Sequence, residues 1–291
     1  MESDTAAAFN TFKSKLLLTD VQKQNVTKRK EIVDGHLTAG FGSSSNLPLI
    51  KSSLIGSAGR GTIIRPLVDI DILAVFSNKD GIYDAYRTNS QAFLYRVRDV
   101  LNKFSRVETV GARGQAVRFF YTDDPHVDVA PVFMRSGGGY LIPDGQGGWL
   151  ATNPDEHASY LARRDTELGN RLKTMIRMSK RWNAQHSGYF KSFHLECLMA
   201  YVFKSIGNDS RVAFEKFFEW AQSRLVVEDP AGFSGDLSTY LSVTARMNLK
   251  SNLESARDRA ARANAAERQG NHKEAIRLWR LTFGDEFPAY G

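Results

Sequence analysis

The chain has 291 residues, 42% of them hydrophobic, which is enough for one large domain or for two lobes with separate cores. No apolar run approaches the ~20 residues that span a bilayer, the start MESDTAAAFNTF lacks the features of a secretory signal, and the net charge of +7 favours anionic partners. The single cysteine, Cys197, excludes an internal disulfide and a multi-cysteine zinc site, so we expect a cytoplasmic protein without membrane association.

The front half alternates helical and strand patterns. Residues 1–37 carry apolar side chains at helical spacing and predict one long helix. Further along, the predicted elements are a strand at 67–76, a helix at 84–104, strands at 116–121 and 126–132, and a loop or hairpin at 136–149. From about residue 155 the spacing is helical throughout, and residues 254–291 predict a helical hairpin broken at Gly270-Asn271. We therefore expect an α+β protein with an all-helical back half.

Two aspartates stand in the apolar strand 67–76. Side chains alternate across a strand, so Asp69 and Asp71 point to one face while Ile70 and Ile72 point to the other. Carboxylates this close repel each other unless cations neutralise them, and magnesium binds both carboxylate and phosphate oxygens. Two-metal sites hold their ions about 3.5–4 Å apart, which adjacent carboxylates can bridge. An exposed edge strand with solvated aspartates is the alternative for this pair taken alone.

A third aspartate strengthens the metal hypothesis. Asp128 lies between Val127 and Val129 in the second apolar strand, with the same alternation of faces. We expect it to bind the metal that activates an attacking hydroxyl. A second strand that carries a carboxylate in apolar surroundings favours a shared metal site over an exposed edge.

A turn of small residues precedes the aspartate pair. The backbone N–H groups of GSAGRGT, residues 56–62, can cradle phosphate, and the Ser57 hydroxyl adds a donor. Thr62 stands where the Walker A motif requires lysine, so we reject a P-loop. Arg60 and Arg65 either meet a triphosphate or are solvated loop charges, and the sequence does not decide between the two.

These motifs together resemble the nucleotidyltransferases of the DNA polymerase β superfamily. Within it, the chain is similar to bacterial cyclic GMP-AMP synthase/DncV-like nucleotidyltransferases, the CD-NTases of the SMODS type. The similar stretches are GSAGRGTIIRPLVDIDILAVF, VDVAPVF, YLIPDGQGGWLATNP, KSFHLECL and AIRLWRLTFGDEFP. They run from about Leu54 to Pro288, and the ending W-R-x-x-F-G-x-x-F-P is the most specific mark of this group.

The resemblance implies a bilobed fold. A polymerase β-like palm with a mixed sheet and the N-terminal helix would occupy residues 1–155, and a helical C-terminal domain residues 156–291, braced by that long helix. Such enzymes join ribonucleoside triphosphates, ATP among them, into a cyclic di- or trinucleotide second messenger that activates a downstream effector in antiphage (CBASS) signalling. An accessory regulatory protein, HORMA-type or ubiquitin-transfer-like, fits the resemblance, and nothing in the sequence selects one.

The resemblance also implies site residues. Two Mg²⁺ ions, or Mn²⁺ in their place, would be bound by Asp69, Asp71 and Asp128. Gly56 and Ser57 would hold the triphosphate, and Lys180 and Ser192 match positions that usually contact it. Phe193 stands where an aromatic side chain often stacks on a base. From the residues alone, a solvated lysine and a helix-capping serine stay open as alternatives.

Two other functions also fit the residues. The same chemistry could act on RNA, on a protein or on a small-molecule acceptor. The basic helix around residues 163–181 could instead track phosphates in a non-catalytic nucleic-acid-binding module. Against that module, the three carboxylates would repel nucleic acid unless metals were present. The single cysteine rules out the cysteine-rich zinc element of DNA-sensing relatives, which argues against activation by DNA.

Overall fold

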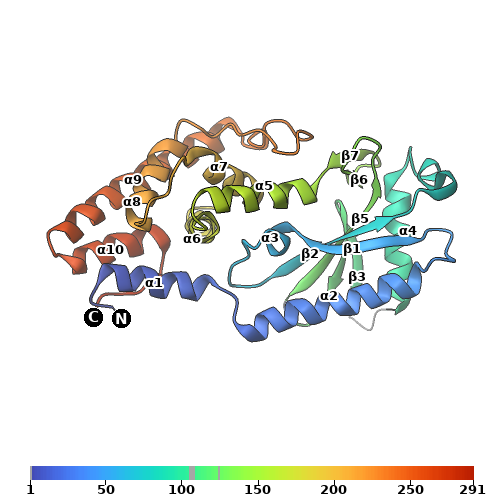
Figure 1. Ribbon diagram of the computed structural model, residues 1–291, viewed down its shortest axis with the longest axis horizontal. Coiled ribbons are helices and arrows are strands. Elements are labelled where there is room, and N and C mark those ends of the chain that lie inside the picture. The colour runs from blue at the N-terminus through green and yellow to red at the C-terminus, as the bar shows by residue number, and fades with distance from the viewer. Residues whose placement is uncertain (1, 105–108, 124) are drawn as a thin grey trace. The chain divides into compact units, whose positions relative to one another are not determined.

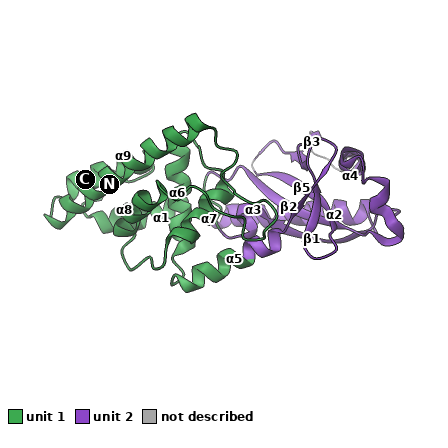
Figure 2. Cartoon of the chain, turned by 90° about the horizontal axis from the view of Figure 1, so that it is seen from above, with its two compact units in different colours: residues 1–17, 62–65, 159–291 green, residues 18–61, 66–158 purple. Residues whose placement is uncertain are grey.

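The computed structural model describes residues 2–104, 109–123 and 125–291, and the chain forms two compact units (Figures 1 and 2). The sheet unit comprises residues 18–61 and 66–158, and the helical unit comprises residues 1–17, 62–65 and 159–291. The division expected from the sequence, 1–155 and 156–291, therefore differs at its boundary and in two short segments that group with the helical unit.

The sheet unit contains all of the strands that the sequence predicts, together with two that it does not. Its elements are α2 (Asp20–Gly40), β1 (Leu49–Ile55), the one-turn helix α3 (Gly56–Gly59), β2 (Asp69–Phe76), the 3₁₀ segment η1 (Lys79–Ala85), α4 (Ser90–Phe104), β3 (Thr109–Arg113), β4 (Ala116–Phe120), β5 (His126–Met134), β6 (Tyr140–Pro143) and β7 (Trp149–Thr152). Helix α5 (Pro154–Glu167) begins in this unit and ends in the helical unit. The predicted loop or hairpin at 136–149 is the β6–β7 hairpin.

The sheet is mixed, as predicted. Its strands run in the order β1-β2-β5-β4-β3, and β6 pairs with β5 and with β7. Only β2 and β5 pair in parallel, while the other described pairs are antiparallel. The sequence prediction missed β1 because Lys51, Ser52 and Ser53 interrupt the apolar pattern of LIKSSLI. It also missed β3, whose TVGAR sequence is short and carries little alternation.

Both faces of β2 are used. Ile70, Ile72 and Phe76 are buried on one face, where Phe76 makes an edge-to-face contact with Phe93 of α4 at 5.4 Å between ring centroids. On the other face, beyond the aspartates, Leu73 and Val75 join a buried cluster with residues of β5 and β6. Helix α2 lies along the sheet and contacts both β1 and α4 (Figure 1). Apolar packing thus fixes the strands while leaving their first residues for charge.

The helical unit contains α1 and the C-terminal helices. They are α1 (Thr5–Leu16), α6 (Leu172–Gln185), α7 (Ser192–Val202), α8 (Ser210–Ala221), α9 (Val243–Arg268) and α10 (His272–Phe283). The helix predicted over residues 1–37 is interrupted, because α1 ends at Leu16 and Thr19 starts α2 with a capping box to Gln22. The predicted break at Gly270-Asn271 is confirmed between α9 and α10.

Aromatic packing joins the two ends of the chain. Phe9 of α1 lies edge-to-face on Trp279 of α10, with 5.0 Å between ring centroids, and contacts Phe287 at 5.1 Å. Phe12 packs on Phe283 at 4.9 Å. These rings are almost fully buried, so α1 supplies part of the helical core. None of the helices in the described ranges is both long enough and apolar enough to cross a bilayer.

Candidate active site

The parallel register of β2 and β5 brings the three aspartates together. Asp71 lies directly opposite Asp128, and Asp69 lies opposite His126 at the start of both strands. Because side chains alternate along a strand, all three carboxylates share the face that carries Leu73 further along. Asp128 is more buried than Asp69: 17% of the Asp128 side chain is exposed, against 46% of the Asp69 side chain. Three carboxylates therefore line one half-buried patch of the sheet.

An arginine from the neighbouring strand lies on this patch. Arg118 of β4 is the antiparallel partner of Asp128 and belongs to the same face. Its guanidinium grips both oxygens of Asp128, with Nε donating to Oδ1 at 2.6 Å, and a terminal nitrogen also donates to Asp69 at 3.3 Å. Ion pairs to Asp128 and Asp69 raise the pKa of Arg118. The arginine is thus a fixed positive charge among the carboxylates.

The pKa of Asp71 reflects its burial and its charged neighbours. Burial, followed by repulsion from Asp69 and Asp128, raises the pKa of Asp71 to about 6. The cations Arg60 and Arg118 act in the opposite direction and only partly offset this. The surroundings of Asp71 thus disfavour its charged form, chiefly through burial and then through its acidic neighbours.

Gly56 allows the preceding turn to approach this cluster. Its backbone adopts φ +60°, and a Cβ placed there would lie 1.8 Å from Oδ2 of Asp71. A glycine is needed both for the left-handed conformation and for the close approach. Ser57 follows as the second residue of α3. The small-residue turn that the sequence singled out therefore lies against the carboxylates.

The residues fit a divalent cation by their chemistry, although their side chains are not arranged around one. Among the described residues, no three His, Cys, Asp or Glu side chains are grouped as a metal-binding set. Arg118 holds two of the three carboxylates in its own hydrogen bonds. Carboxylate oxygens are the ligands that Mg²⁺ prefers, and three carboxylates lie on one face of neighbouring strands. The donor set therefore fits a divalent cation by its chemistry.

Lys180 lies in the interior of the helical unit. Its side chain is 8% exposed, and Nζ forms an ion pair with fully buried Glu196 at 2.6 Å. Nζ also donates to the carbonyl and hydroxyl oxygens of Thr62, both at 3.1 Å, and the Thr62 hydroxyl donates to Glu196 at 2.8 Å. In this network Lys180 has a structural role. The sequence suggested two other roles for it, a triphosphate contact or a solvated side chain. The triphosphate contact stays a prediction.

The other predicted residues of the helical unit occupy the start of α7. Ser192 is the first residue of that helix and is exposed, while half-buried Phe193 packs against the helical core. Their roles toward a nucleotide stay predictions. Of the two loop arginines, Arg60 acts electrostatically on Asp71, whereas Arg65 donates to the carbonyl oxygen of Ser14 at 3.1 Å. Arg60 is therefore the one that belongs with the carboxylate cluster.

Sequence reasoning missed two charged residues of these networks. Arg118 stands between buried Val117 and Phe119, and Glu196 stands between buried Leu195 and Cys197. Each breaks an apolar run, which is the same signal that identified Asp128. A charged side chain in such a place has to be paired. Its partner is found only from the strand register or the helix packing.

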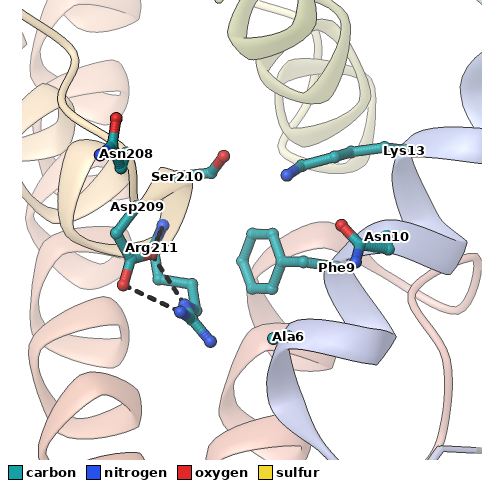
Figure 3. A pocket seen from close by; sticks show the side chains of 8 residues that line it. All are labelled: Ala6, Phe9, Asn10, Lys13, Asn208, Asp209, Ser210 and Arg211. Carbon is teal, nitrogen blue, oxygen red and sulfur yellow. Dashed lines mark hydrogen bonds and ion pairs between the residues drawn. The ribbon is translucent and has the colours of Figure 1, made fainter.

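A polar pocket in the helical unit does not suit a nucleotide. It lies between α1, which contributes Phe9, Asn10 and Lys13, and the start of α8, which contributes Ser210 and Arg211 (Figure 3). Its volume of about 140 Å³ is below the roughly 300–1,000 Å³ of typical ligand pockets. Arg211 is already held by ion pairs to Asp209 and Glu267. The carboxylate cluster is therefore the better candidate for the active site.

A mixed sheet that presents three carboxylates from neighbouring strands beside a small-residue turn defines a polymerase β-like nucleotidyltransferase fold. Residues 3–164 match the Second Messenger Oligonucleotide or Dinucleotide Synthetase (SMODS) domain. The chain belongs to this family of cGAS/DncV-like nucleotidyltransferases, the CD-NTases, as the resemblance implied. It is a nucleotidyltransferase of the class that synthesises cyclic oligonucleotides.

The similar proteins agree with this assignment. The chain is 26% identical over 270 residues to a probable cyclic nucleotide synthase of Bacillus cereus (strain VD146), covering 81% of each protein. It is 27% identical over 262 residues to a cyclic AMP-AMP-AMP synthase of Acinetobacter sp., covering 82% of this chain and 73% of that protein. The fold matches E. coli MS115-1 CdnC in its HORMA-deltaN complex, with a TM-score of 0.82, 18% identity and 98% of both chains covered.

Proposed function

We propose that this protein joins ribonucleoside triphosphates, ATP among them, into a cyclic di- or trinucleotide at Asp69, Asp71 and Asp128. The observation that carries the proposal is the β2–β5 register, which places Asp71 opposite Asp128 with Asp69 on the same face. The choice of ATP is supported by relatives named cyclic AMP-AMP-AMP synthase and by the similar fold of E. coli CdnC, solved with ATP. The products formed from the four NTPs determine base choice, ring size and linkage.

In the proposed reaction, the three aspartates hold two Mg²⁺ ions, or Mn²⁺ in their place. Such ions, when bound, lower the pKa of an acceptor ribose hydroxyl and stabilise the leaving pyrophosphate. The protein contributes the fixed spacing of the carboxylates, because β2 and β5 are locked by their parallel pairing. The apolar residues that follow the aspartates in β2 and β5 are packed in one buried cluster, which helps to maintain that spacing.

Each of the two units contains residues that are proposed to bind the nucleotide. Gly56 and Ser57 bind the triphosphate with backbone N–H groups and a hydroxyl, next to Asp71. Ser192 and Lys180 contribute from the helical unit, Lys180 after a change in its present pairing with Glu196. Phe193 stacks on a base. After the first bond forms, the linear product has to turn over so that its second end can react.

The product is proposed to act as a second messenger in the bacterial cytoplasm. It would activate a downstream effector in antiphage (CBASS) signalling, a role that the SMODS family assignment supports. An accessory regulatory protein belongs to the same proposal, because E. coli CdnC, which shares this fold, was solved in complex with HORMA-deltaN.

The decisive experiment incubates the purified chain with all four NTPs and Mg²⁺ or Mn²⁺, followed by mass spectrometry of the products. We expect phosphatase-resistant cyclic oligonucleotides. The variant Asp69→Asn with Asp71→Asn should lose product formation while keeping its fold. The double variant Asp80→Asn with Asp84→Asn is the matched control, since it removes two exposed carboxylates of the same unit. Undiminished synthesis by the first variant would refute the proposed site.

The alternative of another acceptor is tested in the same incubation. If the chemistry acts on RNA, on a protein or on a small molecule, the label from the nucleotide appears as a ladder on RNA, on the protein band or as a phosphatase-sensitive adduct. Family membership favours cyclisation over these acceptors and over a non-catalytic nucleic-acid-binding module.

A further inference from the structure

We infer that Arg118 is the resident counter-cation of the carboxylate cluster and has to leave Asp128 before a divalent cation can bind there. This inference rests on the proposed function, since it concerns the same three aspartates. Arg118 is then a positioning residue that holds Asp128 and Asp69 in hydrogen bonds in the metal-free protein.

Arg118 is hydrogen-bonded to the carboxylate oxygens that would bind a metal ion. Its Nε and a terminal nitrogen use both oxygens of Asp128, and the same terminal nitrogen reaches Asp69. Planar, two-point pairing of a guanidinium with a carboxylate is among the stronger hydrogen-bonding arrangements in proteins. Bridging two carboxylates with one cation is also what a metal ion does. Arg118 and a divalent cation therefore compete for the same oxygen atoms.

The strand register makes this pairing intrinsic to the fold. Arg118 is the direct cross-strand neighbour of Asp128, and the flanking pairs Val117–Val129 and Phe119–Val127 are buried. The backbone of Arg118 is therefore fixed opposite the site. Only its side chain, 20% exposed, can swing away. The displaced guanidinium stays tethered one strand away from the carboxylates.

Charge balance explains why the protein would keep such a group. Three carboxylates in one half-buried patch repel one another. The guanidinium of Arg118, which is paired with Asp128 and Asp69, offsets part of this repulsion. The three carboxylates carry a formal charge of −3 and two divalent cations carry +4, so a guanidinium that stayed in contact would add to positive charge already in excess. Binding of the ions is therefore coupled to movement of the Arg118 side chain away from the carboxylates.

The first test measures Mn²⁺ binding to the nucleotide-free protein by electron paramagnetic resonance. We expect Arg118→Gln to bind Mn²⁺ about tenfold more tightly than the wild type, because a charge-assisted pairing no longer has to be broken. The matched control is Arg29→Gln, which removes an arginine of the same unit that pairs with Asp123 and stacks on Tyr121. It should leave the affinity within about twofold of the wild type. Equal tightening in both variants, or none in Arg118→Gln, would overturn the inference.

The second test uses the wild-type chain, so it does not depend on how the variant folds. The Nε–H of Arg118 donates to Asp128 at 2.6 Å and should give a slowly exchanging side-chain NMR signal, assigned by its loss in Arg118→Lys. Titration with diamagnetic Mg²⁺ should shift this signal and accelerate its exchange with water. A signal that stays unchanged when the Mg²⁺ site is saturated overturns the inference.

These measurements separate the inference from the proposed function. If Asp71→Asn abolishes Mn²⁺ binding but Arg118→Gln leaves it unchanged, the metal site stands and only the role of Arg118 falls. If Mn²⁺ binding to the wild type does not depend on Asp71, the proposed two-metal site itself falls. Product formation from NTPs, measured separately, reports on the proposed reaction.

Discussion

At the scale of single residues, the site depends on how closely one glycine approaches one aspartate. The Cα of Gly56 is near enough to Asp71 that any side chain at position 56 would overlap the carboxylate, with a Cβ only 1.8 Å from Oδ2. The residues proposed to bind metal and those proposed to bind phosphate thus come from adjoining segments of the chain. Glycine adopts the φ of +60° at this position without strain, whereas a residue with a side chain would not.

Replacing Gly56 by alanine should therefore reduce synthesis more than it reduces stability. We expect a loss of about a hundredfold in activity, since a displacement near 1 Å at a reacting centre has effects of that size. Gly114→Ala is the matched control, because Gly114 has φ +59° but open space around its Cβ position. Both variants carry the same backbone strain, and only the first meets Asp71. Equal activities in the two variants would contradict the importance of the contact.

A buried histidine gives the helical unit a pH dependence of defined sign. Burial of His194 lowers its pKa below the ordinary value, although the carbonyl oxygen of Leu225 accepts from Nε2 at 2.8 Å and partly offsets this. The unfolded chain then binds a proton near pH 6.5 that the native state does not bind. Stability should accordingly fall as the pH drops from 7 towards the lower native pKa. The second imidazole nitrogen pairs with the hydroxyl of Tyr240 at 3.0 Å.

Urea unfolding at pH 7 and at pH 5.5 tests this sign. Between pH 7 and pH 5.5, the free energy of unfolding should change by a smaller loss, or a larger gain, in His194→Gln than in the wild type, whatever the effect of the substitution at pH 7. His36 and His186, whose pKa values burial also lowers, add slopes of the same sign, and Asp71, whose pKa is raised to about 6, adds one of the opposite sign, so the comparison with the variant isolates His194. An unchanged slope in His194→Gln would show that the acid sensitivity arises elsewhere.

At the scale of elements, a buried charged network fastens the segment after the small-residue turn. Lys180 of α6 and Glu196 of α7 are almost completely buried, and both contact Thr62. The chain passes from the sheet unit to the helical unit at this residue. Removing one partner leaves the other charge buried and unpaired, whereas removing both leaves none.

Glu196→Leu alone should therefore lower the free energy of unfolding by about 3–5 kcal/mol, and Lys180→Met together with Glu196→Leu should lower it much less. Chemical denaturation of the two single variants and the double variant gives the coupling between the residues. The exposed pair Glu274 and Arg277 on α10 is the control and should show little coupling. Additive losses at Lys180 and Glu196 would mean that the buried pair does not act as a unit.

The sequence predicts the elements of the site better than their connections. β2 and β5 are evident because three aspartates interrupt otherwise apolar strands, and the same face alternation gives their common side. The pairing of Arg118 with Asp128 was not foreseeable, since it depends on the register between β4 and β5. Likewise Glu196 is visible as a charge in an apolar helix, but only helix packing shows that it holds Lys180.

At the scale of the whole molecule, the helical unit is formed by three separate segments of the chain. Residues 1–17 and 62–65 group with residues 159–291, which a linear reading of domain boundaries does not predict. The reason is packing over a long sequence separation: Phe9 and Phe12 of α1 contact aromatic residues of α10 and beyond. Periodicity identifies such apolar faces but does not identify their partners.

This interleaving predicts that residues 159–291 are unstable without α1. In the structure, the N–H of Glu2 donates to the carbonyl oxygen of Ala289 at 3.0 Å, so a short Gly/Ser linker from Gly291 can carry residues 2–17. The linked fragment should be more helical by circular dichroism and melt at a higher temperature than residues 159–291 alone. Losing one large buried ring costs about 3–5 kcal/mol, and two such losses approach the whole stability of a domain, about 5–15 kcal/mol.

The control for this comparison is the linked fragment with Phe9→Ala and Phe12→Ala. It keeps the length and most of the helical propensity of α1 but removes the rings that pack on Trp279 and Phe283. If those rings are what α1 contributes, the control should melt like residues 159–291 alone. Identical melting of all three fragments would mean that the C-terminal helices are complete by themselves and that α1 is only attached to them.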